Sequence, residues 1–173
     1  MPRNVEIKAR VHDIDTVRAR AAALSDAPAV VLEQEDTFFR VPEERLKLRV
    51  FPDGKGELIA YRRPDSAGPK MSEYFLYRTA DIESLGGLLA TALGIRGVVR
   101  KRRMLYLVGR TRIHLDEVEG LGAFLELEVV LADGQPEAEG EAIARHLLGE
   151  LGVRDEDRVA RAYIDLLEEE SER

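Results

Sequence analysis

The chain contains no cysteine and no tryptophan among its 173 residues. Without cysteine there can be no disulfide and no thiolate ligand, so any bound metal must be held by oxygen or nitrogen atoms. It also lacks an uninterrupted run of about 18 apolar residues, the length needed to cross a bilayer. Residues 1–4 lead into a patterned strand without the apolar core of a signal peptide. These absences predict a cytoplasmic protein that does not bind membranes.

Positive charge is in the minority, with 26 Lys and Arg against 33 Asp and Glu and a net charge of −7. A general nucleic-acid-binding protein usually has a basic surface, so we expect no nucleic-acid partner. Lys and Arg nevertheless crowd residues 96–112, while residues 168–172 are acidic. Local basic density in an acidic protein indicates a confined site for an anion.

The length and composition fit one folded unit. A chain of 173 residues with 45% hydrophobic residues is long enough to bury a core. We find no internal repeat and no low-complexity linker, so the sequence predicts a single domain over residues 1–173. The acidic end, residues 168–173, is expected to fray.

Alternation of apolar and polar residues with a period of two predicts about eight strands. The residues Pro52 to Gly56 suit a hairpin turn, and most other connections are also of hairpin length. The predicted strands cover residues 4–11, 30–41, 46–50, 57–63, 71–78, 98–108, 111–118 and 124–131.

Apolar residues at helical spacing predict four helices between and after these strands. Two of them, residues 14–24 and 82–93, follow the capping residues Asp13 and Asp81. A third follows Pro136 and extends to residue 151, and the last covers residues 159–166. Antiparallel strands with amphipathic helices predict an α+β fold.

Six of the predicted strands place long charged or polar side chains on one face, because residues two apart point the same way. Such faces commonly face solvent in an antiparallel sheet, which is the ordinary interpretation of any single pair. The residues are Glu6 and Lys8; Lys47 and Arg49; Arg62; Lys101 and Arg103; Arg112, His114 and Asp116; Glu126 and Glu128.

The predicted helices favour a different arrangement, in which the polar strand faces point inward. The apolar sides of the helices must pack against something, and the aliphatic faces of the strands are available. Eight strands can then close into an antiparallel β-barrel tunnel with a charged interior and amphipathic helices packed outside. Charges sharing a confined space must pair or be completed by a ligand. Lys and Arg suit phosphate oxygens, and carboxylates suit a hard divalent cation.

The order of the motifs resembles the CYTH family, the triphosphate tunnel metalloenzymes. Residues 4–8, Asn-Val-Glu-Ile-Lys, resemble the ExExK signature that opens this family. Further elements follow in the family's order, including a K-x-P-like element at 62–64, a V-x-K-x-R-like element at 99–103 and ExE at 126–128. The remaining similar elements are residues 46–49, 114–116 and 161–167. The family includes CyaB-type class IV adenylyl cyclases, thiamine triphosphatases and inorganic triphosphatases.

The resemblance implies roles for individual residues. Mg²⁺ or Mn²⁺ would be held by Glu6, Asp116, Glu126 and Glu128, and the catalytic residues would be Glu6, Lys8, Glu126 and Glu128. The residues that bind the triphosphate would be Lys8, Lys47, Arg49, Arg62, Lys101, Arg103 and Arg161. Asn4 replaces the first glutamate of the signature, which leaves open whether one or two metals bind. Arg112, His114 and Glu73 are further candidates for the tunnel interior.

Three functions remain open at this stage. The first is hydrolysis of an organic or inorganic triphosphate, with ATP, thiamine triphosphate or tripolyphosphate as the partner. The second is a class IV adenylyl cyclase that converts ATP to cyclic AMP and pyrophosphate. The third is a non-catalytic module that binds nucleotide or polyphosphate, which the replacement by Asn4 favours. Assembly as a homodimer is left open.

Overall fold

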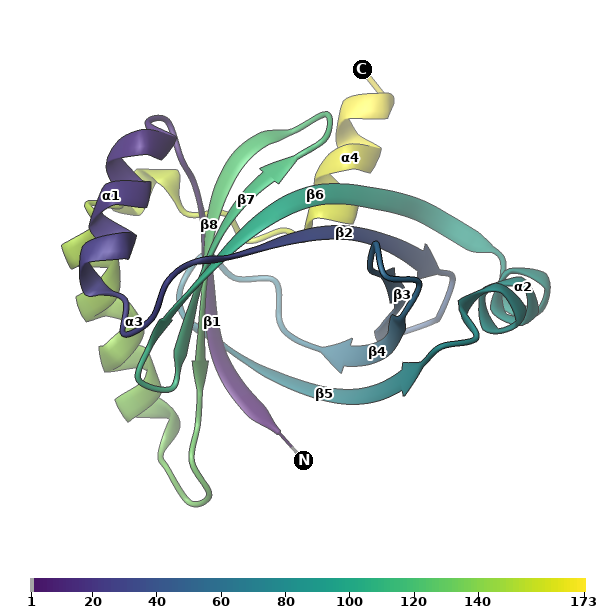
Figure 1. Ribbon diagram of the computed structural model, residues 1–173, viewed down its shortest axis with the longest axis horizontal. Helices are drawn as coiled ribbons and strands as arrows, with labels where there is room; N and C mark the ends of the chain where they lie inside the picture. Colours follow the sequence, from purple (N-terminus) through teal and green to yellow (C-terminus); the bar gives the residue numbers. More distant parts are fainter. Residues whose placement is uncertain (1) are drawn as a thin grey trace.

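The computed structural model describes residues 2–173. Within this range the chain forms eight strands, four α-helices and one short 3₁₀ helix (Figure 1). In chain order they are β1 (Arg3–Arg10), α1 (Ile14–Leu24), β2 (Val30–Phe39), β3 (Arg45–Val50), β4 (Gly56–Arg62), β5 (Lys70–Thr79), α2 (Ile82–Leu93), β6 (Ile95–Val108), β7 (Thr111–Val118), β8 (Gly122–Val130), α3 (Glu137–Leu151), η1 (Asp155–Asp157) and α4 (Tyr163–Ser171).

The strands close into an antiparallel barrel in the order β1-β5-β4-β3-β2-β6-β7-β8. β1 and β8 complete the ring, with Glu6 opposite Glu128 and Lys8 opposite Glu126. The predicted α+β fold with an eight-stranded barrel is therefore confirmed.

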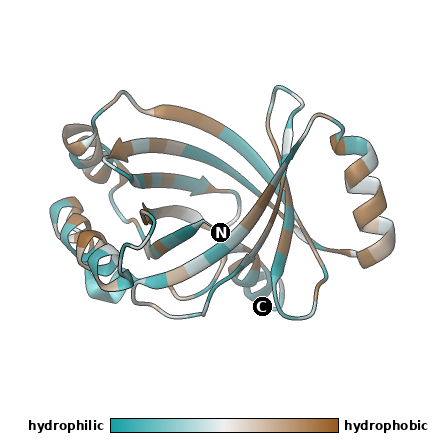
Figure 2. Cartoon of the chain, turned by 90° about the horizontal axis from the view of Figure 1, so that it is seen from below, coloured by the Kyte–Doolittle hydropathy of each residue, from teal (hydrophilic) through white to brown (hydrophobic). Residues whose placement is uncertain are grey.

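The alternation of residue types along the strands decides which face is covered (Figure 2). Val5, Ile7 and Ala9 of β1 are almost fully buried and belong to the aliphatic outer face of the barrel. α3 packs against β1 and β8, and α1 packs against α3. The main hydrophobic core thus lies outside the barrel and leaves the interior to polar residues.

A second hydrophobic cluster joins α4 to the barrel. Phe124 and Tyr163 pack edge to face, with 5.0 Å between ring centroids. Gly97 of β6 permits close approach of this helix, because a Cβ atom there would lie 2.6 Å from Ile164 Cδ1. α4 is therefore held beside the barrel wall, where its first residue reaches the interior.

The last helix begins later than its apolar spacing predicts. Val159 lies in an irregular segment, where its N–H donates to the carbonyl of Lys8 at 2.9 Å. Arg158 pairs with Ala9 in an isolated bridge. These backbone bonds to β1 hold the segment out of helical conformation until Tyr163. α4 continues to Ser171, and within it Glu168 accepts a hydrogen bond from Arg96 at 2.8 Å.

Among the helices of residues 2–173, none combines the length and apolar character needed to span a bilayer.

Candidate functional site

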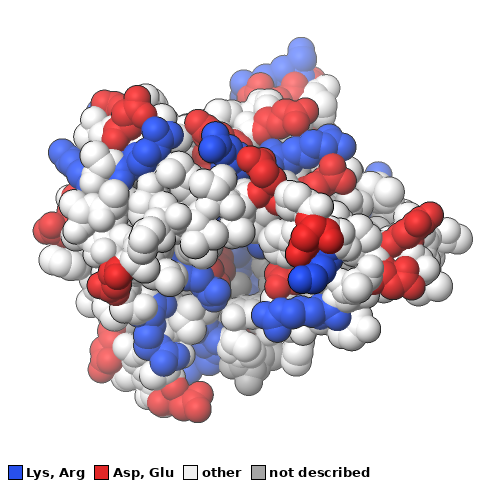
Figure 3. Space-filling model, viewed as in Figure 1, with Lys and Arg blue, Asp and Glu red and all other residues white. Residues whose placement is uncertain are grey.

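The barrel encloses a cavity of about 700 Å³. Its wall carries eight Lys and Arg side chains against five Asp and Glu, a formal excess of three basic residues in a chain whose net charge is −7. A space-filling view of the face shown in Figure 1 is hollowed over the barrel, with Lys and Arg at the hollow (Figure 3). The charged lining residues are Glu6, Lys8, Asp36, Lys47, Arg49, Glu57, Arg63, Arg78, Lys101, Arg103, Arg112, Glu126 and Glu128.

Three of these cations gather around the buried carboxylate of Asp36. Arg49 donates two hydrogen bonds to it, each of 2.8 Å, and Lys47 donates one of 2.8 Å. Lys101 Nζ lies 3.6 Å from the same carboxylate. Burial opposes ionisation, but the three cations hold the pKa of Asp36 well below its usual range. Burial and the neighbouring Arg103 hold the pKa of Lys101 well below its usual range, so an anionic oxygen placed in this cluster would favour its charged form.

Asp116 fixes Arg103 in the cavity wall and does not itself line the cavity. Arg103 donates two hydrogen bonds of 2.7 Å to its two oxygens, and the Tyr163 hydroxyl donates one of 2.8 Å. Burial opposes the charge, yet the adjacent Arg103 guanidinium depresses the pKa of Asp116 strongly. Both oxygens of Asp116 thus accept hydrogen bonds from Arg103 or Tyr163, and its role as a metal ligand stays a prediction.

Three carboxylates of β1 and β8 face the cavity as a group: Glu6, Glu126 and Glu128. Burial and repulsion from Glu126 raise the pKa of Glu6 to about 7, although Arg63 donates a hydrogen bond to it at 3.2 Å. Each of the three carboxylates has a cation within 4 Å, namely Arg63 for Glu6, Lys8 for Glu126 and Arg112 for Glu128.

These three glutamates fit a hard divalent cation by their chemistry, because Mg²⁺ and Mn²⁺ prefer carboxylate oxygens. A bound cation would also relieve the repulsion that raises the pKa of Glu6. Within residues 2–173, no three acidic or histidine side chains are already gathered at metal-binding spacing. Occupation by a metal would therefore require these side chains to turn toward the ion.

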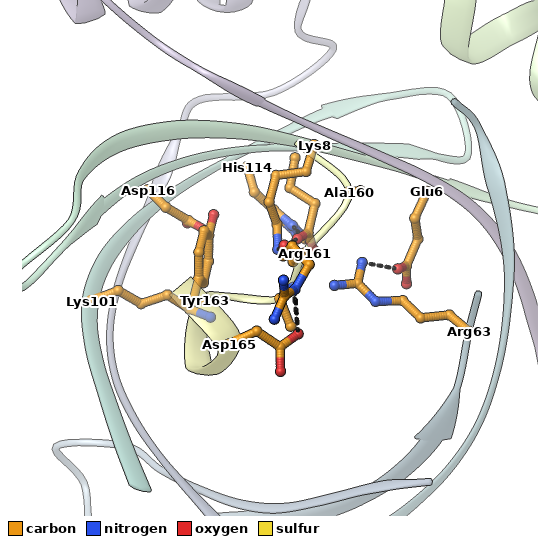
Figure 4. Close-up of polar contacts among 12 residues, drawn as sticks. Glu6, Lys8, Arg63, Lys101, His114, Asp116, Ala160, Arg161, Tyr163 and Asp165 are labelled. Carbon is orange, nitrogen blue, oxygen red and sulfur yellow. Dashed lines mark hydrogen bonds and ion pairs between the residues drawn. The ribbon is translucent and has the colours of Figure 1, made fainter. Parts of the chain in front are cut away.

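Lys8 connects the carboxylates to the C-terminal segment (Figure 4). Its Nζ lies 3.6 Å from Glu126, donates to the carbonyl of Arg161 at 3.3 Å, and lies 4.0 Å from the ring centroid of Tyr163. Burial, together with the nearby Arg63, lowers the pKa of Lys8 to about 7. An anionic ligand placed here would favour its protonated form.

Arg62 does not face the cavity as its predicted strand phase requires. It is exposed and pairs with Glu44 at 2.8 Å, whereas Arg63 lines the cavity and pairs with Glu6 (Figure 4). In β4 the inward residues are Glu57, Ile59 and Tyr61, so the next inward position is 63. In the segment that resembles K-x-P, the arginine that lines the cavity is therefore Arg63 and not Arg62.

Two further candidates lie outside the cavity lining. Glu73 is exposed, because its neighbours Ser72 and Tyr74 take the inward positions of β5. Arg161 is half-exposed and pairs with Asp165 and Glu169. Only the peptide carbonyl of Arg161 contacts the site, through Lys8.

The remaining candidates, Asn4, Arg112 and His114, do line the cavity. The amide nitrogen of Asn4 donates to Glu128, and its carbonyl oxygen is without a hydrogen-bond partner among residues 2–173. Arg112 lies 3.2 Å from Glu128. His114 lies between Glu126 and Glu128, at 3.8 and 3.9 Å, and burial lowers its pKa.

Asp36 and Arg63 are not among the residues that the sequence predicted for the site, although both line the cavity. The signal for Asp36 was its place between Gln34 and Phe38 in an alternating strand. The signal for Arg63 was the two-residue period that runs on from Glu57. The adjacent Arg62 obscured the strand phase of Arg63, and the alternating Phe38 suggested a packed face for Asp36, although both line the cavity.

Comparison with known proteins agrees with this geometry. A family model described as "CYTH domain" matches residues 2–163. Adenylate cyclase CyaB of Aeromonas hydrophila is 30% identical over 176 aligned positions, which cover 95% of this chain and 88% of the relative.

Solved structures show the same barrel. The PH1012 protein of Pyrococcus horikoshii superposes with a TM-score of 0.84 at 27% identity, covering 94% of this chain and 98% of the other. The Hippeastrum protein HpAC1, whose structure reveals a dominant triphosphatase activity, gives 0.67 at 16% identity and shares the fold, covering 98% and 96%. With an eight-stranded barrel, a charged interior and a family match over nearly its whole length, this chain belongs to the CYTH domain family.

Proposed function

We propose that the protein is a metal-dependent enzyme that binds the triphosphate of a small organic molecule in the barrel cavity and hydrolyses it. The observation that supports this proposal is the formal excess of three basic residues on the cavity wall of an acidic protein. Confined positive charge concentrates and holds a polyanion more strongly than an open surface does, because water screens it less.

Different cations of the cavity wall would bind the phosphates and stabilise the transferred phosphoryl group. Lys47, Arg49 and Lys101 already share the carboxylate of Asp36, so phosphate oxygens can join them without recruiting new cations. Arg103 is held rigidly by Asp116, which pre-organises it against charge that develops on the transferred phosphoryl group.

Glu6, Glu126 and Glu128 would hold the Mg²⁺ or Mn²⁺ ion. When bound, the ion neutralises phosphate charge and polarises the oxygen that attacks or leaves. A carboxylate of this group that does not bind the ion could accept the proton of the attacking water.

An organic substrate is favoured by the rest of the cavity wall. Apart from the charged clusters, the lining contains aromatic and aliphatic side chains, which an inorganic polyphosphate would not use. These residues are Leu32, Phe38, Phe51, Ile59, Tyr61, Tyr74, Phe75, Leu76, Val99 and Leu105.

A second candidate is adenylyl cyclisation, which the similarity to Aeromonas CyaB over 95% of the chain favours. The ribose 3′-hydroxyl would then attack the α-phosphorus, and pyrophosphate would leave. The same cationic wall serves both reactions, which differ in the nucleophile and in the phosphorus atom placed in line with it.

The test incubates the purified protein with ATP, thiamine triphosphate or tripolyphosphate, each with Mg²⁺ or Mn²⁺. Release of orthophosphate that stops with EDTA supports the hydrolase proposal, and cyclic AMP with pyrophosphate supports the cyclase. The double variant Glu126→Gln and Glu128→Gln should lose activity in either case. Binding without turnover at every metal concentration would overturn both and favour a non-catalytic module.

A further inference from the structure

Gln34 is a buried amide in the cavity wall. Among residues 2–173, its side chain makes no hydrogen bond to the charged residues around it. It is 6% exposed, it lines the cavity, and its Oε1 atom has no hydrogen-bond partner among residues 2–173. A buried carbonyl oxygen is costly unless a ligand or a water molecule pairs with it. A ligand in the cavity would satisfy this oxygen if the Gln34 amide turned toward it.

The cations next to Gln34 are directed elsewhere. Its strand partner on β6 is Lys101, whose ammonium lies near Asp36 and 5.3 Å from the ring centroid of Tyr163. Arg103, two residues along β6, is held by Asp116. Phosphate oxygens would therefore be drawn toward Asp36 and Tyr163, which leaves Gln34 for another part of the substrate.

The surroundings of Gln34 on its other side are apolar. Leu32 precedes it on the inward face of β2, and both line the cavity. β2 pairs with β3 up to Glu35 opposite Val50, so the next residue, Phe51, lies beside Gln34 and also lines the cavity. Gln34 thus belongs to a small group with an aromatic ring and an aliphatic side chain.

The distance along β2 suits a nucleoside triphosphate. Gln34 and Asp36 lie two residues apart on one face, which corresponds to about 7 Å. The triphosphate would lie at the Asp36 end, and the base would lie at the Gln34 end against Phe51. Aromatic side chains bind bases by stacking, and a glutamine amide offers one donor and one acceptor in a single plane.

We propose that Gln34 and Phe51 form the base-binding site, in which the Gln34 amide selects adenine and the Phe51 ring stacks on it. The amide matches the N7 acceptor and the exocyclic amino donor of adenine, whereas guanine presents two acceptors at that edge. This proposal rests on the proposed function, because it requires a triphosphate at the cationic end of the cavity.

The test compares KM and kcat for ATP, GTP and tripolyphosphate in the wild type and in Gln34→Leu, Phe51→Ala and Glu35→Gln. Calorimetry replaces the kinetics for any ligand that binds without turnover. Glu35 is the matched control, because it lies on the same strand and pairs with Arg100 on the outside of the barrel. Thermal unfolding checks that each variant is folded.

The wild type should prefer ATP over GTP by about tenfold or more, a typical discrimination by a bidentate amide–base pair. Gln34→Leu should abolish most of this preference by weakening ATP alone, and Phe51→Ala should weaken ATP and GTP about equally. Neither variant should change the value for tripolyphosphate, and Glu35→Gln should change none.

Two results would overturn the base assignment alone. One is tripolyphosphate binding with no preference between ATP and GTP in the wild type. The other is an equal loss for ATP and tripolyphosphate in Gln34→Leu, which would place the amide in the phosphate site. If the wild type binds no triphosphate at all, the proposed function fails and the base assignment fails with it.

Discussion

Adjacent arginines at the end of β4 have opposite environments. Arg63 is buried and pairs with Glu6 inside the barrel, while Arg62 is exposed and pairs with Glu44. A surface pair of the second kind contributes little to stability or binding. The contrast makes these two residues a natural matched pair for testing which one contacts the ligand.

Arg63→Ala should weaken tripolyphosphate binding by about tenfold or more, the usual cost of a lost charge-assisted hydrogen bond. Arg62→Ala should change the dissociation constant by less than about twofold. Calorimetric titration of both variants measures the difference. Equal effects, or a larger effect in Arg62→Ala, would show that the strand phase described here does not hold in the bound protein.

Asp36 should be the main stabilising carboxylate of the empty cavity. Replacing it by asparagine leaves Lys47, Arg49 and Lys101 buried without their shared anion, at a cost of about 3 kcal/mol at pH 7. The folded-state pKa of Asp36 is depressed, so its contribution is fully present above the unfolded-state pKa of about 3.9 and is lost as pH falls below it.

Denaturant unfolding of the wild type and Asp36→Asn between pH 7 and pH 3 measures this contribution. The difference in unfolding free energy should be constant above about pH 5 and shrink toward acid. A difference that stays constant down to pH 3 would show that the ionised carboxylate is not what stabilises the cluster.

The packing of α3 on the barrel depends on one helical glycine. A Cβ atom at Gly140 would lie 2.7 Å from both Leu131 Cδ2 and Val5 Cγ2, so the helix approaches β1 closely only because this residue lacks a side chain. Gly149 of the same helix has no atom within 4 Å of its virtual Cβ.

Gly140→Ala should therefore destabilise the protein by about 1–3 kcal/mol through overpacking. Gly149→Ala should stabilise it by about 0.5 kcal/mol, because alanine restricts the unfolded chain at no steric cost. Thermal unfolding of both variants provides the comparison. If Gly140→Ala were as stable as the wild type, α3 would not be packed tightly against β1.

Binding of a ligand in the cavity should stabilise the whole barrel against unfolding. Because the cations come from five different strands and from Arg63 just after β4, a bound triphosphate would connect most of the sheet. At a ligand concentration 100 times the dissociation constant, binding adds about 2.7 kcal/mol to stability. In a chain of this size, that corresponds to a rise of about 5–10 °C in melting temperature.

Tripolyphosphate with Mg²⁺ should produce this rise, and the variant Lys47→Ala with Arg49→Ala should show a much smaller one. Differential scanning fluorimetry over a range of ligand concentrations makes the measurement. A melting temperature that does not depend on ligand in the wild type would contradict a triphosphate site in this cavity.

Local patterns predicted most of the architecture. Five of the six predicted strands that were assigned a charged face turn that face inward in the structure, because alternation is set by adjacent residues and needs no knowledge of the fold. The exception is the strand of Arg62, where two successive arginines made both phases equally plausible. Glu73, beside Ser72, was ambiguous for the same reason.

Partnerships between distant residues could not be predicted in this way. Asp36 is held by residues of β3 and β6, and Asp116 is held by Arg103 and Tyr163, which are 13 and 47 positions away. Which carboxylate pairs with an arginine, and which remains available to a cation, depends on the closure of the ring and on the position of α4.

Residue order thus fixed the elements, the charge of their faces and the family to which the chain belongs, because these follow from short-range periodicity and motif spacing. Barrel closure brought distant charges together, so that Arg63 meets Glu6 and Lys8 meets Glu126. Those outcomes depend on side chains brought together from strands far apart in the chain, where distance and burial decide the energy of every pair.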